Sequence, residues 1–281
     1  MSQSVYLRPA RVEEALQALA ARPLTVLAGG TDFYPARVGR LVREDILDIT
    51  ALAPLRGITQ TEEGWRIGAL TTWTELIDTP LPPVFHGIKL AAREVGGFQI
   101  QNAATVIGNL CNASPAADGV PPLMALSAEV ELSSINARRR IALADFVTGN
   151  RRTARQADEL VTAVLVPHHG SRARSTFLKL GTRRYLVISI AMVAVTLDVS
   201  PEGTIVHARV VVGACAPVAR HIRTLEARLL GHPLSSNVGD LATAADLSGL
   251  APISDVRGSS EYRLDAALTL VRRALQEAGN E

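Results

Sequence analysis

Apolar residues recur with helical spacing in some segments of the chain and form short continuous runs in others. Residues 11–22 carry apolar side chains three and four positions apart, which predicts a helix that Pro23 ends. The apolar runs 24–28 and 45–49 predict two strands, with room for a short helix between them. The N-terminal region is therefore expected to be a small strand–helix–strand unit, with a subdomain boundary near residue 58.

The middle of the chain combines short helices with short strands. A turn, a strand and a helix with a threonine N-cap follow one another in residues 62–76, and a further helix is expected at 88–96. Residues 101–126 show no periodicity and almost no bulky or charged side chains, so we expect a long irregular loop that runs into a helix begun by Pro121 and Pro122. Short strands are expected at 129–134, 139–143 and 159–167.

The last third of the chain predicts an antiparallel sheet covered by helices. Beyond a linker at 168–174, the segments 175–181, 188–199 and 207–216 are expected to be three strands, or else a helix between two strands. Helical spacing then recurs in the segments 220–231, 236–247 and 259–278. The pattern as a whole predicts an α+β protein. Its regions are a first domain of residues 1–170, made of subdomains 1–58 and 59–170, and a C-terminal domain of residues 171–281.

Composition and charge exclude several classes of function. The chain has 281 residues, of which 47% are hydrophobic, yet no apolar run approaches the roughly 20 residues that span a bilayer, so we expect no membrane insertion. The first residues do not form a secretory signal, and the cytoplasm is the expected compartment. A net charge of +2 is too small for a nucleic-acid surface, and the dense basic group at 137–140 is interpreted as a solvated turn between strands. Two cysteines, Cys111 and Cys215, are too few for an iron–sulfur cluster or a structural zinc site, and we expect no metal.

A pair of glycines follows the first buried strand. Gly29 and Gly30 allow a positive φ and let a ligand approach the backbone amides, while Thr31 and Asp32 suit the N-cap of a helix. Free N–H groups at such a turn bind anions, a phosphate above all. Taken by itself, this stretch is better explained by a plain tight turn without a ligand. The phosphate-loop pattern and the Gly-x-Gly-x-x-Gly pattern of dinucleotide-binding sheets are absent.

A second stretch with few large side chains lies in residues 101–126. It offers short polar groups at Thr105, Asn109 and Ser114, and Asp118 is expected to cap the helix that follows. Because long loops in compact domains are usually functional, the two stretches together suggest a clamp around a ligand. The alternative is a polar loop that packs on itself.

At these residues the chain resembles the FAD-binding medium subunits of molybdenum hydroxylases, a family that includes the carbon monoxide dehydrogenase medium chain and the flavin domain of xanthine dehydrogenase. The motif "AGGTD" at 28–32 is similar to the first flavin loop of that family, and "TVIGN" with "NASPAAD" at 105–118 to the second. "FLKLGTRRYLVISIAMVAV", "VVVGACAPVARHIRTLEARLLG" and "SSEYRLDAALTLVRRAL" resemble its C-terminal domain. The resemblance covers nearly the whole chain.

The resemblance implies a vanillyl-alcohol-oxidase-like (PCMH-type) FAD-binding domain of two α+β subdomains, followed by a CO-dehydrogenase-flavoprotein-like C-terminal domain. It implies that the two loops hold the diphosphate of FAD, that Asp118 binds the adenosine end, and that Lys179 approaches the flavin. Tyr185 is expected to stack on the flavin ring or else to pack in an ordinary way. The implied cofactor-binding residues are Ala28, Gly29, Gly30, Thr31, Asp32, Thr105, Val106, Ile107, Gly108, Asn109, Ser114, Asp118, Lys179 and Tyr185.

The chain departs from the family pattern at two positions. Ile107 stands where the family usually has a glycine, and Gln101 where arginine is common. A β-branched residue held at positive φ costs about 1–3 kcal/mol, so either the backbone at Ile107 is ordinary or the loop is displaced.

The resemblance also implies a role and partners. The chain has no evident general base, and we expect no catalytic residue. It is expected to be an electron-transfer flavoprotein subunit that works with a large molybdenum-cofactor subunit and a small [2Fe–2S] subunit. Two alternatives stay open: a binding or assembly protein that has lost its flavin, and a free-standing flavin oxidase.

Overall fold

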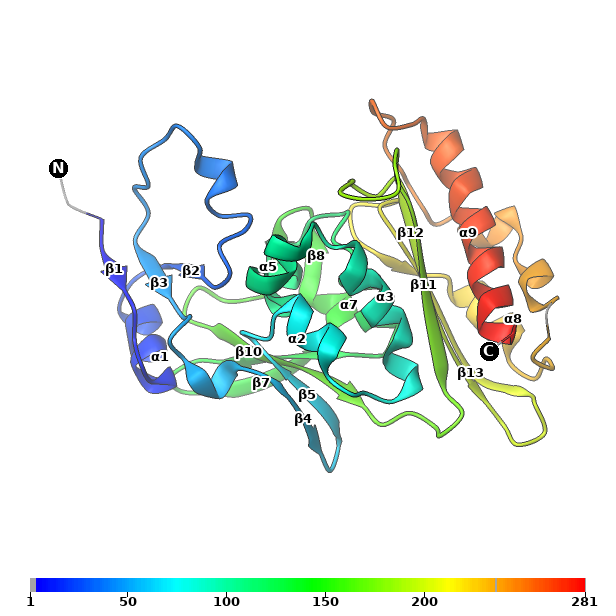
Figure 1. The fold of residues 1–281 in the computed structure, drawn as a ribbon, viewed down its shortest axis with the longest axis horizontal. Coiled ribbons are helices and arrows are strands. Elements are labelled where there is room, and N and C mark those ends of the chain that lie inside the picture. The colour runs from blue at the N-terminus through cyan, green and yellow to red at the C-terminus, as the bar shows by residue number, and fades with distance from the viewer. Residues whose placement is uncertain (1–3, 236, 281) are drawn as a thin grey trace.

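The computed structural model describes residues 4–235 and 237–280. Residues 1–3 and 281, at the outer ends of the first and last predicted domains, lie outside the described residues, as does Ser236 in a predicted helical segment. Three main sheets follow one another along the long axis of the molecule (Figure 1). The predicted boundaries near residues 58 and 170 fall between these sheets.

The first sheet is parallel and has the strand order β1-β3-β2. Its strands are β1 (Tyr6–Leu7), β2 (Thr25–Leu27) and β3 (Ile46–Asp48). Helix α1 (Val12–Ala21) buries Ala15 and Leu19, which confirms the helix predicted from the apolar spacing. Between β2 and β3 the chain makes a long excursion, in which the expected short helix is only a 3₁₀ turn, η1 (Pro35–Arg37).

The second sheet is antiparallel, with the strand order β4-β5-β10-β6-β7. Strands β4 and β5 form a hairpin. The inner strands β5, β10 and β6 have one apolar face, which packs on helices of the core. The strands are β4 (Ile58–Thr61), β5 (Gly64–Gly68), β6 (Glu129–Ser133), β7 (Arg138–Ala142) and β10 (Leu160–Pro167). The helices that accompany them are α2 (Trp73–Asp78), α3 (His86–Glu94), α4 (Phe98–Ala103), α5 (Val106–Asn112), α6 (Val120–Ala125) and α7 (Leu143–Phe146). The remaining short elements are η2 (Ala53–Leu55), η3 (Pro83–Phe85), β8 (Val147–Gly149) and β9 (Arg152–Thr153).

Two predictions for this region are wrong. The stretch before Pro121 is not an irregular loop, because the end of α4 and all of α5 fall within it, whereas the helix predicted from Pro121 and Pro122 is confirmed as α6. The basic group at 137–140 is not a turn, since it enters strand β7, where Arg139 pairs with Glu159 at 2.6 Å. The predicted threonine cap is confirmed: Thr72 forms a capping box at the start of α2.

The C-terminal domain contains a four-stranded antiparallel sheet buried on both faces. Its strands are β11 (Arg174–Leu180), β12 (Ala191–Val199), β13 (Ile205–Gly213) and β14 (Arg220–His221). On β12, Met192 and Ala194 face the core of the first domain, while Val193 and Val195 face a separate C-terminal core. This double burial explains the uninterrupted apolar run of the strand.

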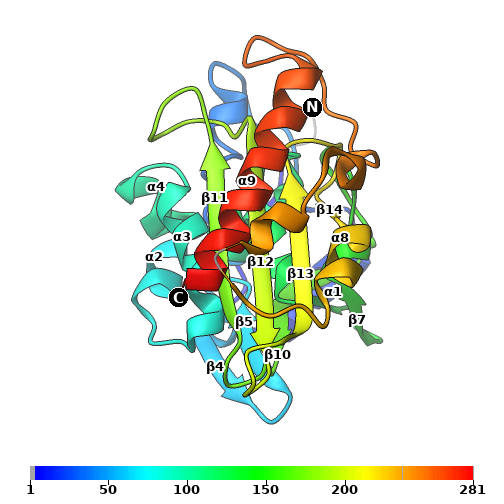
Figure 2. The same ribbon diagram turned by 90° about the vertical axis from the view of Figure 1, so that its right-hand side faces the viewer.

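Helices cover the outer face of this sheet. The long helix α9 (Ser260–Asn280) lies across it, with α8 (Arg223–Leu229) beside β13 (Figure 2). The helix predicted at 236–247 is wrong, because the described residues of this segment form two 3₁₀ turns, η4 (Val238–Leu241) and η5 (Ala244–Leu247). Within the described residues, no helix is both long and apolar enough to cross a membrane.

Candidate flavin site

The two glycines after β2 are required by the geometry of the first loop. A Cβ atom on Gly29 would lie 2.0 Å from the carbonyl oxygen of Ala103 and 3.0 Å from the Cα atom of Ala104. Gly30 has φ +70°, and a Cβ atom there would meet the ring of Tyr34 at 2.8 Å. Only glycine fits either position without a shift of its neighbours. The contact at Gly29 also brings the first loop directly against the residues that precede the second.

The first loop presents a row of unpaired backbone amides. The β2–β3 ladder ends at Leu27, and the amides of residues 29–33 have no acceptor in the described part of the chain. Ala28 and Thr31 are half-buried beside this row, and Asp32 is exposed. The predicted cap by Thr31 or Asp32 is wrong, because η1 has Tyr34 as its N-cap and no side-chain cap. The loop is thus an open turn of N–H groups, which suits an anion such as a diphosphate.

The second loop is the start of helix α5. Thr105 is its N-cap, and the Thr105 hydroxyl accepts a hydrogen bond from the Gly108 amide at 2.9 Å. The Val106 amide donates to the carbonyl oxygen of Thr71 at 2.9 Å. Ile107 lies buried within the helix and is not among the residues with positive φ. The first alternative for this position therefore holds: the backbone at Ile107 has an ordinary φ.

Asn109 connects α5 to the start of α6. Its side-chain oxygen accepts a hydrogen bond from the Gly119 amide at 3.2 Å. A Cβ atom on Gly119 would lie 2.6 Å from the ring of Trp73, so glycine allows the two helices to approach over this indole. The Trp73 indole nitrogen is buried and has no hydrogen-bond partner among the described residues.

The turn between α5 and α6 contacts the C-terminal domain. The Ser114 hydroxyl accepts a hydrogen bond from the Ala116 amide at 3.3 Å, which stabilises the turn from within. The carbonyl oxygen of Pro115 accepts one from the Ala214 amide at 3.0 Å. Ser114 is therefore a turn residue whose hydroxyl lies near the boundary between the domains.

Asp118 and Lys179 form a buried ion pair across that boundary. The Lys179 ammonium lies 2.7 Å from one carboxylate oxygen of Asp118, and the Ser189 hydroxyl donates to the other at 2.7 Å. The side chains of Lys179 and Asp118 are 6% and 10% exposed. Burial raises the pKa of Asp118, although Lys179 and Ser189 act in the opposite direction. The residue does not cap α6, whose N-cap is Gly119 without a side-chain bond, so that prediction is wrong.

The contact between Asp118 and Lys179 changes the roles that the resemblance implied. An extended dinucleotide places its adenosine and flavin ends far apart, whereas these two side chains touch. Both would therefore face the same part of a bound cofactor. Ser189 was missed in the sequence analysis, because it lies 71 residues from Asp118 along the chain and belongs to no motif that points to it.

Tyr185 lies in the segment between β11 and β12. Its side chain is 60% exposed, and the Arg184 guanidinium lies 5.3 Å from its ring. An exposed aromatic ring close in sequence to Lys179 is available to stack on a planar ligand.

A chain of direct contacts runs from Gly29 through α5 and Asn109 to Asp118 and Lys179. It provides a cradle that a Cβ atom would fill, a row of free amides and a buried cation. These features fit a cofactor with a diphosphate and a polar ring. The contacts link the loop at Gly29 to the start of α5, to Asn109 and to the pair of Asp118 and Lys179, whereas no described side-chain contact joins Thr31, Asp32, Ser114 or Tyr185 to this set.

Comparison with known proteins identifies the family of the chain. Residues 1–169 match the family described as "FAD binding domain in molybdopterin dehydrogenase", and residues 176–278 match "CO dehydrogenase flavoprotein C-terminal domain". The chain belongs to the FAD-binding medium subunits of the molybdenum hydroxylases. It is thus an FAD-binding subunit of an oxidoreductase, and the α+β fold of a flavin domain and a CO-dehydrogenase-flavoprotein-like domain is confirmed.

Individual relatives cover almost the whole of this subunit. The xanthine dehydrogenase FAD-binding subunit of Escherichia coli O157:H7 is 31% identical over 97% of this chain and 95% of its own. The nicotine 6-hydroxylase medium subunit of Paenarthrobacter nicotinovorans is 30% identical over 98% and 96%. Among solved structures, reconstituted CO dehydrogenase from Oligotropha carboxidovorans superposes with a TM-score of 0.90 at 27% identity, covering 99% of this chain and 98% of that chain.

Proposed function

We propose that this subunit is the electron-transfer flavoprotein of a multi-subunit molybdenum hydroxylase, accepting electrons from a [2Fe–2S] subunit and passing them to an external acceptor. FAD supplies a centre that stores two electrons and exchanges them singly or in pairs. The observation that carries the proposal is the continuous set of contacts from the open amide turn at Gly29 to the buried Lys179.

The backbone of the first loop holds the diphosphate in this proposal. The free amides of residues 29–33 act as fixed donors, and Ala28 to Asp32 line the turn. Backbone amides need no side-chain ordering when a ligand binds, so little conformational entropy is lost. Residues 105–109 of the second loop fix the position of the first loop. At the start of α5, the Ile107 amide is the one donor that has no acceptor among the described residues.

Lys179 provides the buried positive charge. An ammonium group has three N–H donors, of which one is directed to Asp118 at 2.7 Å and one to the carbonyl oxygen of Glu94 at 3.5 Å. The third would be available to an oxygen or nitrogen of a bound flavin, and Asp118 with Ser189 fixes the orientation of the Lys179 side chain. Ser114 lies near the same boundary, and the exposed ring of Tyr185 would be available to stack on a bound flavin.

The partners follow from what this chain lacks and from the names of its relatives. An iron–sulfur cluster requires about four cysteine ligands, and the sequence contains two. Similar chains are named medium subunit or medium chain, which is the nomenclature of a three-part complex. We therefore assign a small [2Fe–2S] subunit and a large molybdenum-cofactor subunit as partners.

Reconstitution with FAD tests the cofactor part of the proposal. Purified chain incubated with FAD and desalted should retain about one flavin per chain, measured from its visible absorbance. Protein that stays colourless would contradict it and favour the flavin-free alternative.

Electron transfer is tested with the partners. After co-expression with the neighbouring genes, the flavin should be reduced by substrate only when the molybdenum and iron–sulfur subunits are present. Turnover of a small substrate by the isolated chain would instead indicate a free-standing oxidase.

A further inference from the structure

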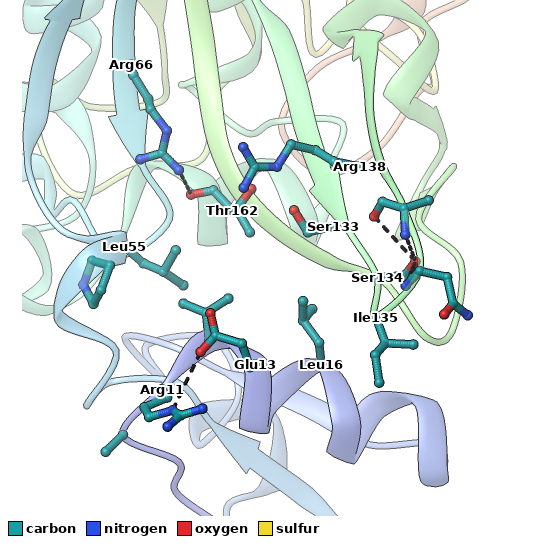
Figure 3. A pocket seen from close by; sticks show the side chains of 15 residues that line it. Arg11, Glu13, Leu16, Leu55, Arg66, Ser133, Ser134, Ile135, Arg138 and Thr162 are labelled. Carbon is teal, nitrogen blue, oxygen red and sulfur yellow. Dashed lines mark hydrogen bonds and ion pairs between the residues drawn. The ribbon is translucent and has the colours of Figure 1, made fainter.

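A cleft separates helix α1 from the polar face of the five-stranded sheet (Figure 3). Its volume is about 610 Å³, within the range of small-molecule sites. Side chains of α1 line one side, and those of strands β5, β6 and β7 line the other. None of the lining residues belongs to the flavin site.

A buried hydroxyl without a partner lines this cleft. Ser133 is 5% exposed, and its hydroxyl has no hydrogen-bond partner among the described residues. Figure 3 shows the hydroxyl beside the side chain of Arg138, with Thr162 lying nearer to Arg66. A buried polar atom is nearly always hydrogen-bonded in a folded protein, so this one points to a ligand.

Two guanidinium groups reach the same space with unused donors. Arg138 lies directly opposite Ser133 in the β6–β7 ladder, and its nearest ionic contact is Glu131 at 3.8 Å. None of its N–H groups has a hydrogen-bond acceptor in the described part of the chain. Arg66 uses one nitrogen, Nη2, for Glu131 at 3.2 Å and for the Thr162 carbonyl oxygen, which leaves its other nitrogens available.

The charge and polarity of the cleft define what it can hold. Glu131 neutralises one of the two arginines, while the second positive charge remains without a hydrogen-bonded anion. Opposite the arginines, Leu16, Leu55 and Ile135 supply apolar side chains around Glu13, whose carboxylate lies 3.7 Å from the Arg11 guanidinium (Figure 3). An anionic head group would meet the arginines and the hydroxyl, and an apolar body would meet the apolar side chains.

We propose that this cleft binds a small organic anion, with a phosphate or carboxylate group held by Arg66, Arg138 and Ser133 and an apolar body packed against Leu16, Leu55 and Ile135. The site spans the first and second sheets, because α1 belongs to one and the arginines to the other. The inference does not depend on the proposed function.

The test uses the full chain loaded with FAD, titrated by calorimetry with phenyl phosphate, benzoate and the neutral benzyl alcohol. Phenyl phosphate, benzoate or both should bind, whereas benzyl alcohol should not. Binding of phenyl phosphate alone identifies a phosphate ester as the ligand class, and binding of benzoate alone a carboxylate. If neither anion binds, or if benzyl alcohol binds as well as they do, the proposal is overturned.

Variants connect the binding to these residues. Arg138→Gln changes a side chain that is 70% exposed and should fold normally, and it should raise the Kd at least about tenfold. Ser133→Ala should raise the Kd by a similar factor and should not lower the Tm of the ligand-free protein, because the hydroxyl has no bond to lose. Arg273→Gln, an exposed arginine on α9, is the matched control and should leave the Kd unchanged. Anion binding that survives both cleft variants, or a lower Tm for ligand-free Ser133→Ala, would overturn the assignment.

Discussion

Replacement of Gly29 by alanine should separate the two loops of the flavin site. The new Cβ atom would lie 2.0 Å from the Ala103 carbonyl oxygen, and real contacts of this kind are longer than 3.0 Å, so the two segments must move apart by about 1 Å. Both atoms that clash with it, the oxygen and the carbonyl carbon at 2.8 Å, belong to the backbone, so no side-chain rotation relieves the overlap. Overpacking costs about 1–3 kcal/mol, and we expect the upper end here. A displacement of this size at a diphosphate should also weaken FAD binding at least about tenfold.

The assay combines thermal unfolding with FAD retention after desalting. At about 3 kcal/mol, Tm should fall by about 6–10 °C for a chain of this length. Gly249→Ala is the matched control, since a Cβ atom at Gly249 meets nothing within 4 Å and the residue has no positive φ. Gly29→Ala protein with the Tm and FAD content of the Gly249→Ala control would refute the reasoning that the loops are in contact.

Three further predictions concern charge and stacking. Lys179→Met leaves the Asp118 carboxyl without its cation, so its pKa, already raised by burial, should rise further. The folded state then holds a proton that the unfolded state has lost, so the free energy of unfolding of the variant should fall relative to wild type as the pH rises from about 5 to about 8. A difference in the free energy of unfolding that does not change with pH would contradict this. The pKa of Asp255 is lowered to about 2, first by the Arg257 backbone amide and then by the side chain of Arg257. Asp255→Asn should therefore remove stability that the wild type has above about pH 4 and loses as the pH falls towards 2, and an unchanged acid transition by circular dichroism would argue against this. Tyr185→Ala should leave Tm unchanged, because the ring is 60% exposed, yet it should alter the fluorescence of bound FAD; an identical spectrum would exclude stacking.

The long strands and the two long helices could be predicted because their apolar periodicity extends over many residues. The run 191–199 is buried on both faces, and of the two alternatives left open for this segment, a strand or a helix between strands, the structure shows the strand. The helix 106–112 could not be predicted, since glycine and asparagine have low helix propensity and seven residues do not form a stable helix alone. It is held by tertiary bonds, from Asn109 to Gly119 and from Val106 to Thr71. Strands of two residues, such as β1 and β9, are too short to show any periodicity.

The site shows the same division between local and distant causes. Gly30 was identified because a positive φ is a local requirement. The cap expected from Asp118 was wrong because a local interaction competes with a distant one: the carboxylate bonds instead to Lys179, 61 residues away, and to Ser189. Sequence patterns indicate which residues are polar and near a turn, whereas the partner of a buried charge depends on how the two domains pack.

The structure also explains how Ile107 is compatible with an FAD-binding subunit. At a position of positive φ this residue would strain the backbone, but here it lies buried in a helix with ordinary φ. Its neighbours leave little for a ligand, because the Val106 amide bonds to Thr71 and the Gly108 amide to Thr105. The free donors are thus concentrated in residues 29–33. In the proposed site, the first loop would therefore supply most of the hydrogen bonds to the diphosphate, and the second loop, with the buried Ile107, would fix the position of the first.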